Sequence, residues 1–187
     1  CTAITVHNYF KRRGKIPTDF WIPVPHDNRK KGSIWPVLGN HLSFLFYRIS
    51  KVHLENKKAC IASLNDQMMD QIKQQIPSAY THLMNYMRII PSILYARMIK
   101  GPSGKSLSTF LFTVAAQHPA DLMEMFNCKI TNALSIPPNT YPPGLTFAYN
   151  RFQGRLQIVV LSYAHLFSEK EMDQLENDLK KELLGKI

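Results

Sequence analysis

The chain has 187 residues, of which 45% are hydrophobic, and it carries a formal net charge of +10 at pH 7. This length corresponds to one domain, or to one half of a two-lobed protein, and the hydrophobic content excludes a disordered tail. The charge favours an anionic partner such as phosphate groups, a membrane surface or nucleic acid, although a solvated basic face has the same composition.

Three cysteines stand far apart and never in a CxxC pair: Cys1, Cys60 and Cys128. They predict neither a disulfide framework nor a zinc site, and they favour a reducing, intracellular compartment. No uncharged apolar run approaches the roughly 18 residues that a membrane span needs. We therefore expect no transmembrane segment in this chain.

The first element in chain order is a predicted helix over residues 1–13. Its basic end, Lys11–Arg13, is followed by Gly14, which is typical of a helix C-terminus. No start signal precedes the helix, so we expect it to begin before Cys1 and the chain to have been cut upstream.

Two extended segments follow. Residues 19–32, DFWIPVPHDNRKKG, predict an edge or irregular strand that ends in a basic turn. Pro23 and Pro25 are the reason, because each pushes its preceding residue toward extended geometry and removes a backbone donor. Residues 39–50, GNHLSFLFYRIS, predict a strand with both faces partly buried.

From Leu54 to about Lys100 the apolar spacing becomes helical. Pro77 interrupts this stretch, and Pro91 kinks or ends its second helix. Two apolar stripes result: Ile61, Leu64, Met68 and Ile72, then Leu83, Met84, Met87 and Ile90. Stripes that contain methionine usually belong to a core, and they also line adaptable apolar pockets.

The last third of the chain returns to strands. Residues 100–106 read as a linker, 107–116 as a buried strand and 134–144 as a proline-rich loop. A hairpin is then predicted, with strands at 145–149 and 156–161 and Gly154 in the connection.

A final helix is predicted from Ser168, which forms a capping box with Glu171, to Gly185. Its buried stripe is Met172, Leu175, Leu179 and Leu183. The alternation of strands and helices predicts a mixed α/β fold, with a sheet covered by helices on at least one face.

The sequence contains no self-sufficient catalytic motif. The GKS at 104–106 is no phosphate-binding loop, because Ile99 stands where a glycine is needed and a strand follows. The seven histidines show no HExxH spacing and no adjacent pair, and there is no GxSxG elbow. The aromatic residues lie in apolar strands rather than among the basic clusters, so we expect no nucleic-acid partner.

Three segments together resemble a known family. They are VHNYFKRRGKIP at 6–17, LGNHLSFLFYRI at 38–49, and PPGLTFAYNRFQGRLQIVVLSYAHLFSEKEMDQL at 142–175. Their order and spacing are similar to the C-terminal half of the wax ester synthase/diacylglycerol acyltransferase family. The resemblance covers essentially the whole chain.

The resemblance implies a chloramphenicol-acetyltransferase-like fold, in which two lobes face each other across a tunnel. Residues 1–187 would form the single C-terminal lobe, while the catalytic HHxxxDG motif belongs to an N-terminal lobe absent from this chain. The implied activity is transfer of a fatty acyl group from acyl-CoA to a long-chain alcohol or diacylglycerol. The implied lobe has no catalytic residue, metal ligand or cofactor of its own; acyl-CoA is a substrate.

The resemblance also suggests substrate-binding residues. Gly39 and Asn40 match the family's GN and are candidates to shape the tunnel, although the turn habits of a Gly-Asn pair favour a simple strand-entry turn. Arg29 and Lys30, together with the cluster Lys11–Arg13, are candidates to attract CoA phosphates or anionic lipid headgroups. We accordingly expect association with a membrane surface, at the endoplasmic reticulum or plasma membrane.

Two departures from the family pattern concern substrate choice and activity. The family's NVPGP loop should fall near residues 113–119, where only Thr113, Ala115 and Pro119 resemble it, and its aspartate after the hairpin is Ala164 or His165 here. A second hypothesis is therefore a non-catalytic lipid- or acyl-chain-binding domain. A lobe that packs on another should expose an apolar face, whereas a self-sufficient domain should unfold cooperatively by itself.

Overall fold

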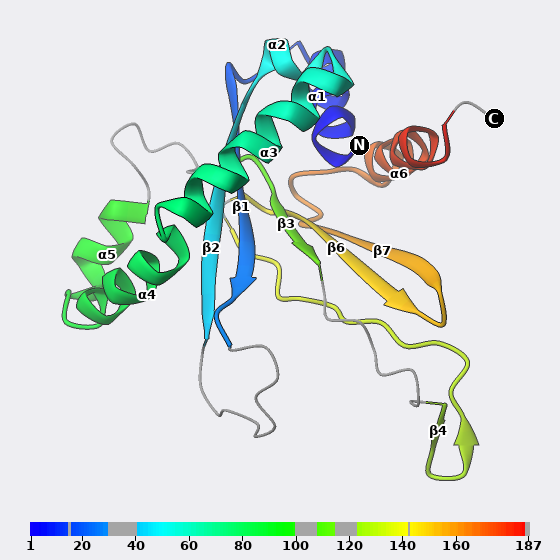
Figure 1. The fold of residues 1–187 in the computed structure, drawn as a ribbon. Helices are drawn as coiled ribbons and strands as arrows, with labels where there is room; N and C mark the ends of the chain where they lie inside the picture. Colours follow the sequence, from blue (N-terminus) through cyan, green and yellow to red (C-terminus); the bar gives the residue numbers. More distant parts are fainter. Residues whose placement is uncertain (15, 30–40, 100–107, 115–122, 142, 186–187) are drawn as a thin grey trace.

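The computed structural model describes all residues except 15, 30–40, 100–107, 115–122, 142 and 186–187 (Figure 1). The first half contains α1 (Thr2–Arg12), β1 (Asp19–Asp27), β2 (Leu42–Ser50), α2 (Lys51–Leu54), α3 (Lys57–Lys73), α4 (Ile76–Met87) and α5 (Ser92–Ile99). The second half contains β3 (Leu111–Val114), β4 (Glu124–Met125), β5 (Cys128–Lys129), β6 (Leu145–Phe152), β7 (Arg155–Ser162) and α6 (Glu169–Leu184). The predicted mixed α/β class is confirmed, and the predicted linker at 100–106 lies outside the described residues.

β1 and β2 form a regular two-stranded antiparallel ladder, so of the two predicted alternatives for β1 the edge strand is confirmed and the irregular strand is wrong. Pro23 lies opposite Phe46, and Pro25 lies opposite Phe44. The N–H and C=O groups of Phe46 both bond to Gln71, on the side away from β1. Pro23 and Pro25 therefore occupy positions that donate no hydrogen bond to β2, so the ladder loses nothing by their missing N–H groups.

Two side chains of α3 occupy the outer edge of β2, and we call them the glutamine pair. Gln71 accepts from Phe46 N at 2.7 Å and donates to Phe46 O at 2.8 Å. Gln67, one helical turn earlier, makes the same two bonds to Arg48, each at 2.8 Å. The two amide side chains thus satisfy backbone groups that a neighbouring strand would otherwise bind.

The second sheet has the order β3–β6–β7, with β3 parallel to β6 and β6 antiparallel to β7. The β6–β7 hairpin has a two-residue turn, Gln153 and Gly154, with φ values of 47° and 76°. Turns with positive φ at both positions match the twist of hairpin strands, so both strands extend further than predicted. The backbone N–H of Thr109 donates to the carbonyl oxygen of Trp21 at 2.8 Å and connects this part of the chain to β1.

The predicted buried strand at 107–116 is short within the described residues. β3 covers Leu111–Val114 only; Phe110 before it is buried, whereas Val114 is 67% exposed. A small β4–β5 hairpin follows that the sequence did not predict, with Phe126 at its tip 87% exposed.

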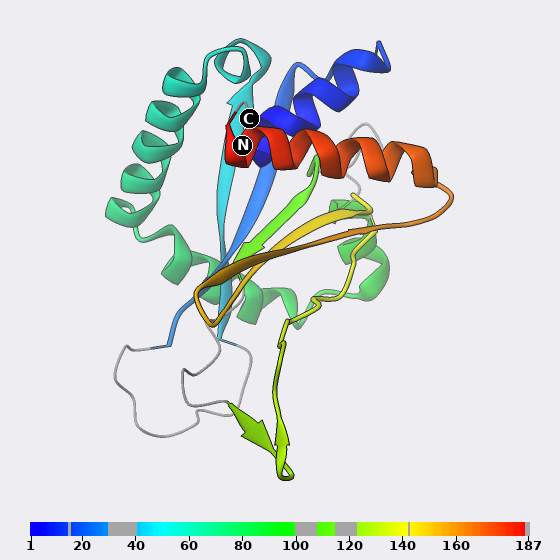
Figure 2. The same ribbon diagram turned by 90° about the vertical axis from the view of Figure 1, so that its right-hand side faces the viewer.

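α1 and α6 lie side by side at one end of the molecule (Figures 1 and 2). The capping box is present, since Ser168 and Glu171 exchange hydrogen bonds at the start of α6. The predicted stripe is confirmed, with Leu175 and Leu179 buried in the common core. That core also includes Val6, Tyr9, Phe20, Ile22, Leu45, Tyr47, Ile49, Leu54, Cys60, Phe110, Leu145 and Phe147.

The two apolar stripes predicted for the helical region have different environments in the structure. α3 ends at Lys73, and Gln75, with φ of 54°, reverses the chain before Pro77 enters the first turn of α4. No residue of α4 is buried, so a core role for its stripe is wrong.

Within the described part of the chain, no helix combines the length and apolarity that a membrane crossing requires.

Candidate functional site

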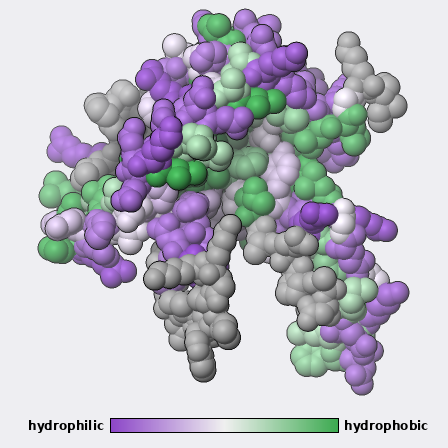
Figure 3. All heavy atoms as spheres, in the orientation of Figure 1, coloured by the Kyte–Doolittle hydropathy of each residue, from purple (hydrophilic) through white to green (hydrophobic). Residues whose placement is uncertain are grey.

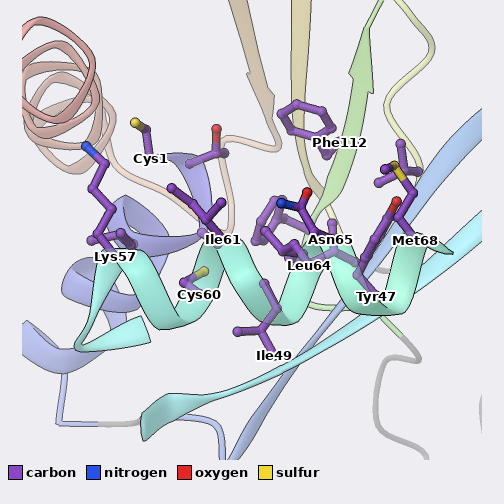
Figure 4. Close-up of a pocket in the computed structure, with 16 residues that line it drawn as sticks. Cys1, Tyr47, Ile49, Lys57, Cys60, Ile61, Leu64, Asn65, Met68 and Phe112 are labelled. Atoms are coloured by element: carbon purple, nitrogen blue, oxygen red, sulfur yellow. The ribbon is translucent and has the colours of Figure 1, made fainter. Parts of the chain in front are cut away.

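An apolar pocket lies between the first turn of α1, the inner face of the β1–β2 ladder, α3 and the strand β3 (Figure 4). Its volume is about 380 Å³, which falls within the range of ligand-binding sites. The lining residues are Cys1, Thr2, Ala3, Ile4, Ile22, Val24, Tyr47, Ile49, Lys57, Cys60, Ile61, Leu64, Asn65, Met68, Phe110 and Phe112.

The local structure explains why these residues face one space. On strands, alternate side chains point to the same side, and the pocket takes pairs two residues apart from β1, from β2 and around β3. On α3 the lining residues recur every three or four positions, which places them on one helical face. Of the predicted stripe, Ile61, Leu64 and Met68 line this pocket.

The pocket has a closed floor and an open rim. Ile49 is fully buried and Cys60 is 4% exposed, whereas Ile61 is 52% exposed. Leu64 and Met68 are half-buried between these extremes. A ligand would therefore cover apolar surface that now faces solvent, which favours binding by the hydrophobic effect.

Two polar side chains of α3 give the pocket a direction. In Figure 4, Lys57 lies toward one end of the α3 wall and Met68 toward the other, with Asn65 between them. Eleven residues separate Lys57 from Met68, so at about 1.5 Å per residue this wall is roughly 16 Å long. An elongated apolar ligand with a polar or anionic group at the Lys57 end fits this arrangement.

Burial favours the protonated forms of two side chains on the pocket walls, Tyr47 and Cys60. Burial raises the pKa of the Tyr47 hydroxyl and the pKa of the Cys60 thiol. The protonated thiol is a poor nucleophile, since the thiolate is the reactive form. Among the described residues, no group of three His, Cys, Asp or Glu side chains could hold a metal ion.

One buried histidine lies near this region without lining the pocket. His7 of α1 is 3% exposed and packs against the ring of Phe20 at 5.8 Å. Burial lowers the pKa of His7, which favours the neutral imidazole. It belongs to the packing of α1 on β1.

Of the four candidate site residues from the sequence, Arg29 is described by the structure, and it does not line the pocket. Gly39, Asn40 and Lys30 lie outside the described residues. Arg29 is exposed and donates to the Asp27 carboxylate, with Nε to Oδ2 at 2.8 Å and Nη2 to Oδ2 at 2.6 Å. These hydrogen bonds lower the pKa of Asp27 to about 2. All four assignments remain predictions.

The basic end of α1 has structural partners on α6. Arg12 forms an ion pair with Asp178 at 2.6 Å, and Arg13 forms one with Glu171. The Arg13 guanidinium also lies over the Tyr9 ring, 5.1 Å from its centroid. Two of the three cations in the cluster Lys11–Arg13 thus hold α1 to α6.

On α3, sequence reasoning missed three pocket residues, Lys57, Cys60 and Asn65, and it assigned none of the lining residues of α1 or the strands to a pocket. A signal was present, because Lys57 and Asn65 fall on the same helical face as Ile61, Leu64 and Met68. Polar residues within an apolar stripe distinguish a ligand-facing wall from a core face, because a buried lysine would need a partner.

Comparison with known proteins reveals similarity in structure only. No protein-family model matches the chain, and no curated protein matches it. The starter condensation domain of rhizomide synthetase RzmA superposes with a TM-score of 0.51 and 12% identity, covering 98% of this chain and 40% of that one. The chain has a condensation-domain-like fold. It spans about 40% of the length of that domain.

A second condensation domain, from the enacyloxin polyketide synthase, has a TM-score of 0.47 and 12% identity, covering 95% of this chain and 33% of that one. The fold assignment rests on the first domain. Condensation domains share the chloramphenicol-acetyltransferase-like, two-lobed fold with the wax ester synthase family. The predicted fold class is therefore confirmed, whereas membership of the wax ester synthase family stays a prediction.

Proposed function

We propose that this chain is the C-terminal lobe of an acyl-CoA-dependent O-acyltransferase, which transfers a fatty acyl group to a long-chain alcohol or diacylglycerol. An N-terminal lobe with the HHxxxDG motif would supply the general base, since an imidazole near neutral pKa can take the proton of the acceptor hydroxyl. The observation that carries the proposal is the apolar pocket of about 380 Å³ in a chain with this fold.

The chemistry of the pocket supports an acyl ligand. Its walls are almost entirely apolar, as a hydrocarbon chain requires, and its α3 wall ends at a lysine. Acyl-CoA combines a hydrocarbon chain with phosphate groups, and a cation beside an apolar pocket attracts that combination. The role of this chain would be to bind and orient the acyl group.

The second candidate is a non-catalytic acyl-chain-binding domain. One observation favours it: the family's NVPGP loop and its aspartate after the hairpin are replaced by other residues in this sequence. Such a domain would bind acyl-CoA or fatty acid and perform no transfer.

An acyl-transfer assay separates the two candidates. The longest native product that contains residues 1–187, and the 187-residue chain alone, would each be incubated with radiolabelled palmitoyl-CoA and either hexadecanol or dioleoylglycerol. We expect wax ester or triacylglycerol from the longer product, and binding without turnover from the chain alone. Binding without transfer by both would favour the binding domain, and no binding by either would reject both candidates.

Filling the pocket tests whether it is the binding site. Leu64→Trp places a larger ring in the pocket, and we expect at least about tenfold weaker palmitoyl-CoA binding, because the ring occupies apolar volume that the ligand needs. Leu83→Trp makes the same exchange on α4, outside the pocket, and serves as the matched control. Equal affinity of the two variants would exclude the pocket as the site.

A further inference from the structure

The region around α4 and α5 exposes large apolar side chains, which we call the α4–α5 face. Ile89, in the turn between the helices, and Ile93 are both 81% exposed. The others are Leu83 at 51%, Tyr86 at 71% and Leu94 at 53%. Figure 3 shows green, apolar spheres on the side of the molecule where α4 and α5 lie in Figure 1. Patches of this kind on a protein surface mark sites of interaction.

Two of these exposed residues, Ile89 and Leu94, belong to one shallow hollow. Ile89, Ile90, Pro91, Leu94 and Arg97 line it. The hollow includes the turn that joins the two helices, and Ile89 in that turn is 81% exposed. Arg97 places a cation directly beside them.

The charge of this region has a single sign. Residues 71–120 contain no aspartate or glutamate, although they include Lys73, Arg88 and Arg97. All three cations are exposed. A solvent-facing helix usually mixes both signs, as α6 does with its acidic first turn and its later lysines. The helices α4 and α5 and the turn between them therefore carry no acidic residue beside their exposed cations, which makes this apolar face complementary to an anionic, lipidic surface.

We propose that the α4–α5 face binds the surface of a membrane that contains anionic lipid. The apolar side chains at the turn enter the boundary between headgroups and acyl chains, and the ring of Tyr86 lies at the same level. Arg88, Arg97 and Lys73 contact the anionic headgroups. This binding is separate from the acyl pocket, and it would bring the molecule to the surface where lipid alcohols are found.

A membrane fits this face better than a protein partner does. A protein that covered the face would have to present acidic groups to its three exposed cations, whereas an anionic bilayer does so at every position. The exposed turn also suits insertion into a soft surface, because it needs no matching concave partner. Covering by protein is nevertheless a distinct outcome of the test below.

The experiment is flotation of the full chain with lipid vesicles. One set contains phosphatidylcholine alone, and the other contains about 30% phosphatidylserine, which mimics an anionic leaflet. We expect the chain to float with the anionic vesicles and to bind the neutral vesicles, or the anionic vesicles at high salt, at least about fivefold more weakly. Failure of the chain to bind anionic vesicles would overturn the proposal.

Two pairs of variants separate the apolar and the charged contributions. Ile89→Asp with Ile93→Asp should weaken vesicle binding by about tenfold or more, because both side chains leave water on insertion. The matched control is Met125→Asp with Phe126→Asp, on the exposed β4–β5 hairpin. Arg88→Glu with Arg97→Glu should abolish the preference for anionic vesicles, while Arg151→Glu with Arg155→Glu changes net charge equally and should preserve it.

Two readouts guard this interpretation. All substituted residues are exposed, so the urea midpoint should stay close to that of the original chain. Size-exclusion chromatography would detect covering by protein: if the isoleucine variant dissociates an oligomer yet binds vesicles unchanged, the proposal is wrong. The acyl-CoA affinity of the variants should not change, so failure here leaves the proposed function intact.

Discussion

α6 and α4 are both helices with apolar residues at helical spacing, yet they have opposite environments. α6 buries Leu175 and Leu179 completely or nearly so, at 0% and 3% exposure. α4 buries none of its 12 residues, and its Leu83 is 51% exposed. The comparison teaches that apolar periodicity predicts a helix and its preferred face, while the element that covers this face is decided elsewhere in the chain.

The contacts of the two helices explain the difference. α6 is joined to α1 by the ion pair between Arg12 and Asp178 and by the bonds of Glu171 to Tyr9 and Arg13. α4 contacts β2 mainly through Tyr80, whose ring lies 5.5 Å from that of Phe44. α6 therefore packs against the core, whereas α4 contacts the edge of β2.

Truncating one leucine on each helix tests whether the difference in burial between α6 and α4 is matched by a difference in stability. Leu175→Ala should lower the free energy of unfolding by about 2–5 kcal/mol, because a buried leucine leaves a cavity. Leu83→Ala should lower it by less than about 1 kcal/mol, since half of its surface already meets water. Urea denaturation at constant m-value measures both, and equal losses would contradict the assignment of α6 to the core.

Removing the glutamine pair should have the next largest effect. Gln67→Ala with Gln71→Ala deletes four hydrogen bonds to the edge of β2, and we expect a loss of about 2 kcal/mol in the free energy of unfolding. Gln74→Ala, just beyond the end of α3, is the control and should be nearly neutral. If the double variant were as stable as the control, water would be satisfying the strand edge equally well.

Glu171 sharpens the comparison through pH, with the smallest expected effect. Hydrogen bonds from Ser168, and then the bond from Arg13, lower the pKa of Glu171 from 4.5 to about 2. A carboxylate with a depressed folded-state pKa stabilises the fold above pH 4.5 and loses that contribution as the pH falls toward 2. Glu171→Ala should therefore be less stable than the original chain at neutral pH, and the gap should narrow across this window.

Thermal unfolding at several pH values measures that gap. Glu169→Ala removes another carboxylate from the first turn of α6 and serves as the control. A gap that stayed constant between pH 5 and pH 2 would contradict the role of the Glu171 charge.

Local signals in the sequence predicted the fold well where one short segment decides the outcome. The capping box of Ser168 and Glu171 and the stripe through Leu175 are of this kind, because both depend on neighbours within one helix. The register that accommodates Pro23 was not predictable, because it depends on where Phe46 falls on another strand. The hairpin strands were predicted too short, because glutamine is an unusual residue at positive φ and Gln153 was therefore not expected in the turn.

The candidate site was predicted only in part, for the same reason. Ile61, Leu64 and Met68 formed a stripe with an open choice between core and pocket, and the residues of α1, β1, β2 and β3 that line the opposite walls decide that choice. Lys57 and Asn65 could be recognised as pocket residues only once the positions of those walls were known. Of the residues drawn from family resemblance, Arg29 pairs with Asp27 and does not line the pocket, whereas Lys30, Gly39 and Asn40 lie outside the described residues.

The glutamine pair also fixes the position of α3, which forms one wall of the pocket. Four hydrogen bonds join side chains one turn apart on α3 to backbone groups two residues apart on β2, so α3 cannot slide or rotate by one residue without losing them. Because Lys57, Leu64 and Met68 belong to the same helix, the pair fixes how far each lies from the strands opposite. The position of the ligand-facing wall is therefore set at the outer edge of the sheet, by residues that never touch the pocket.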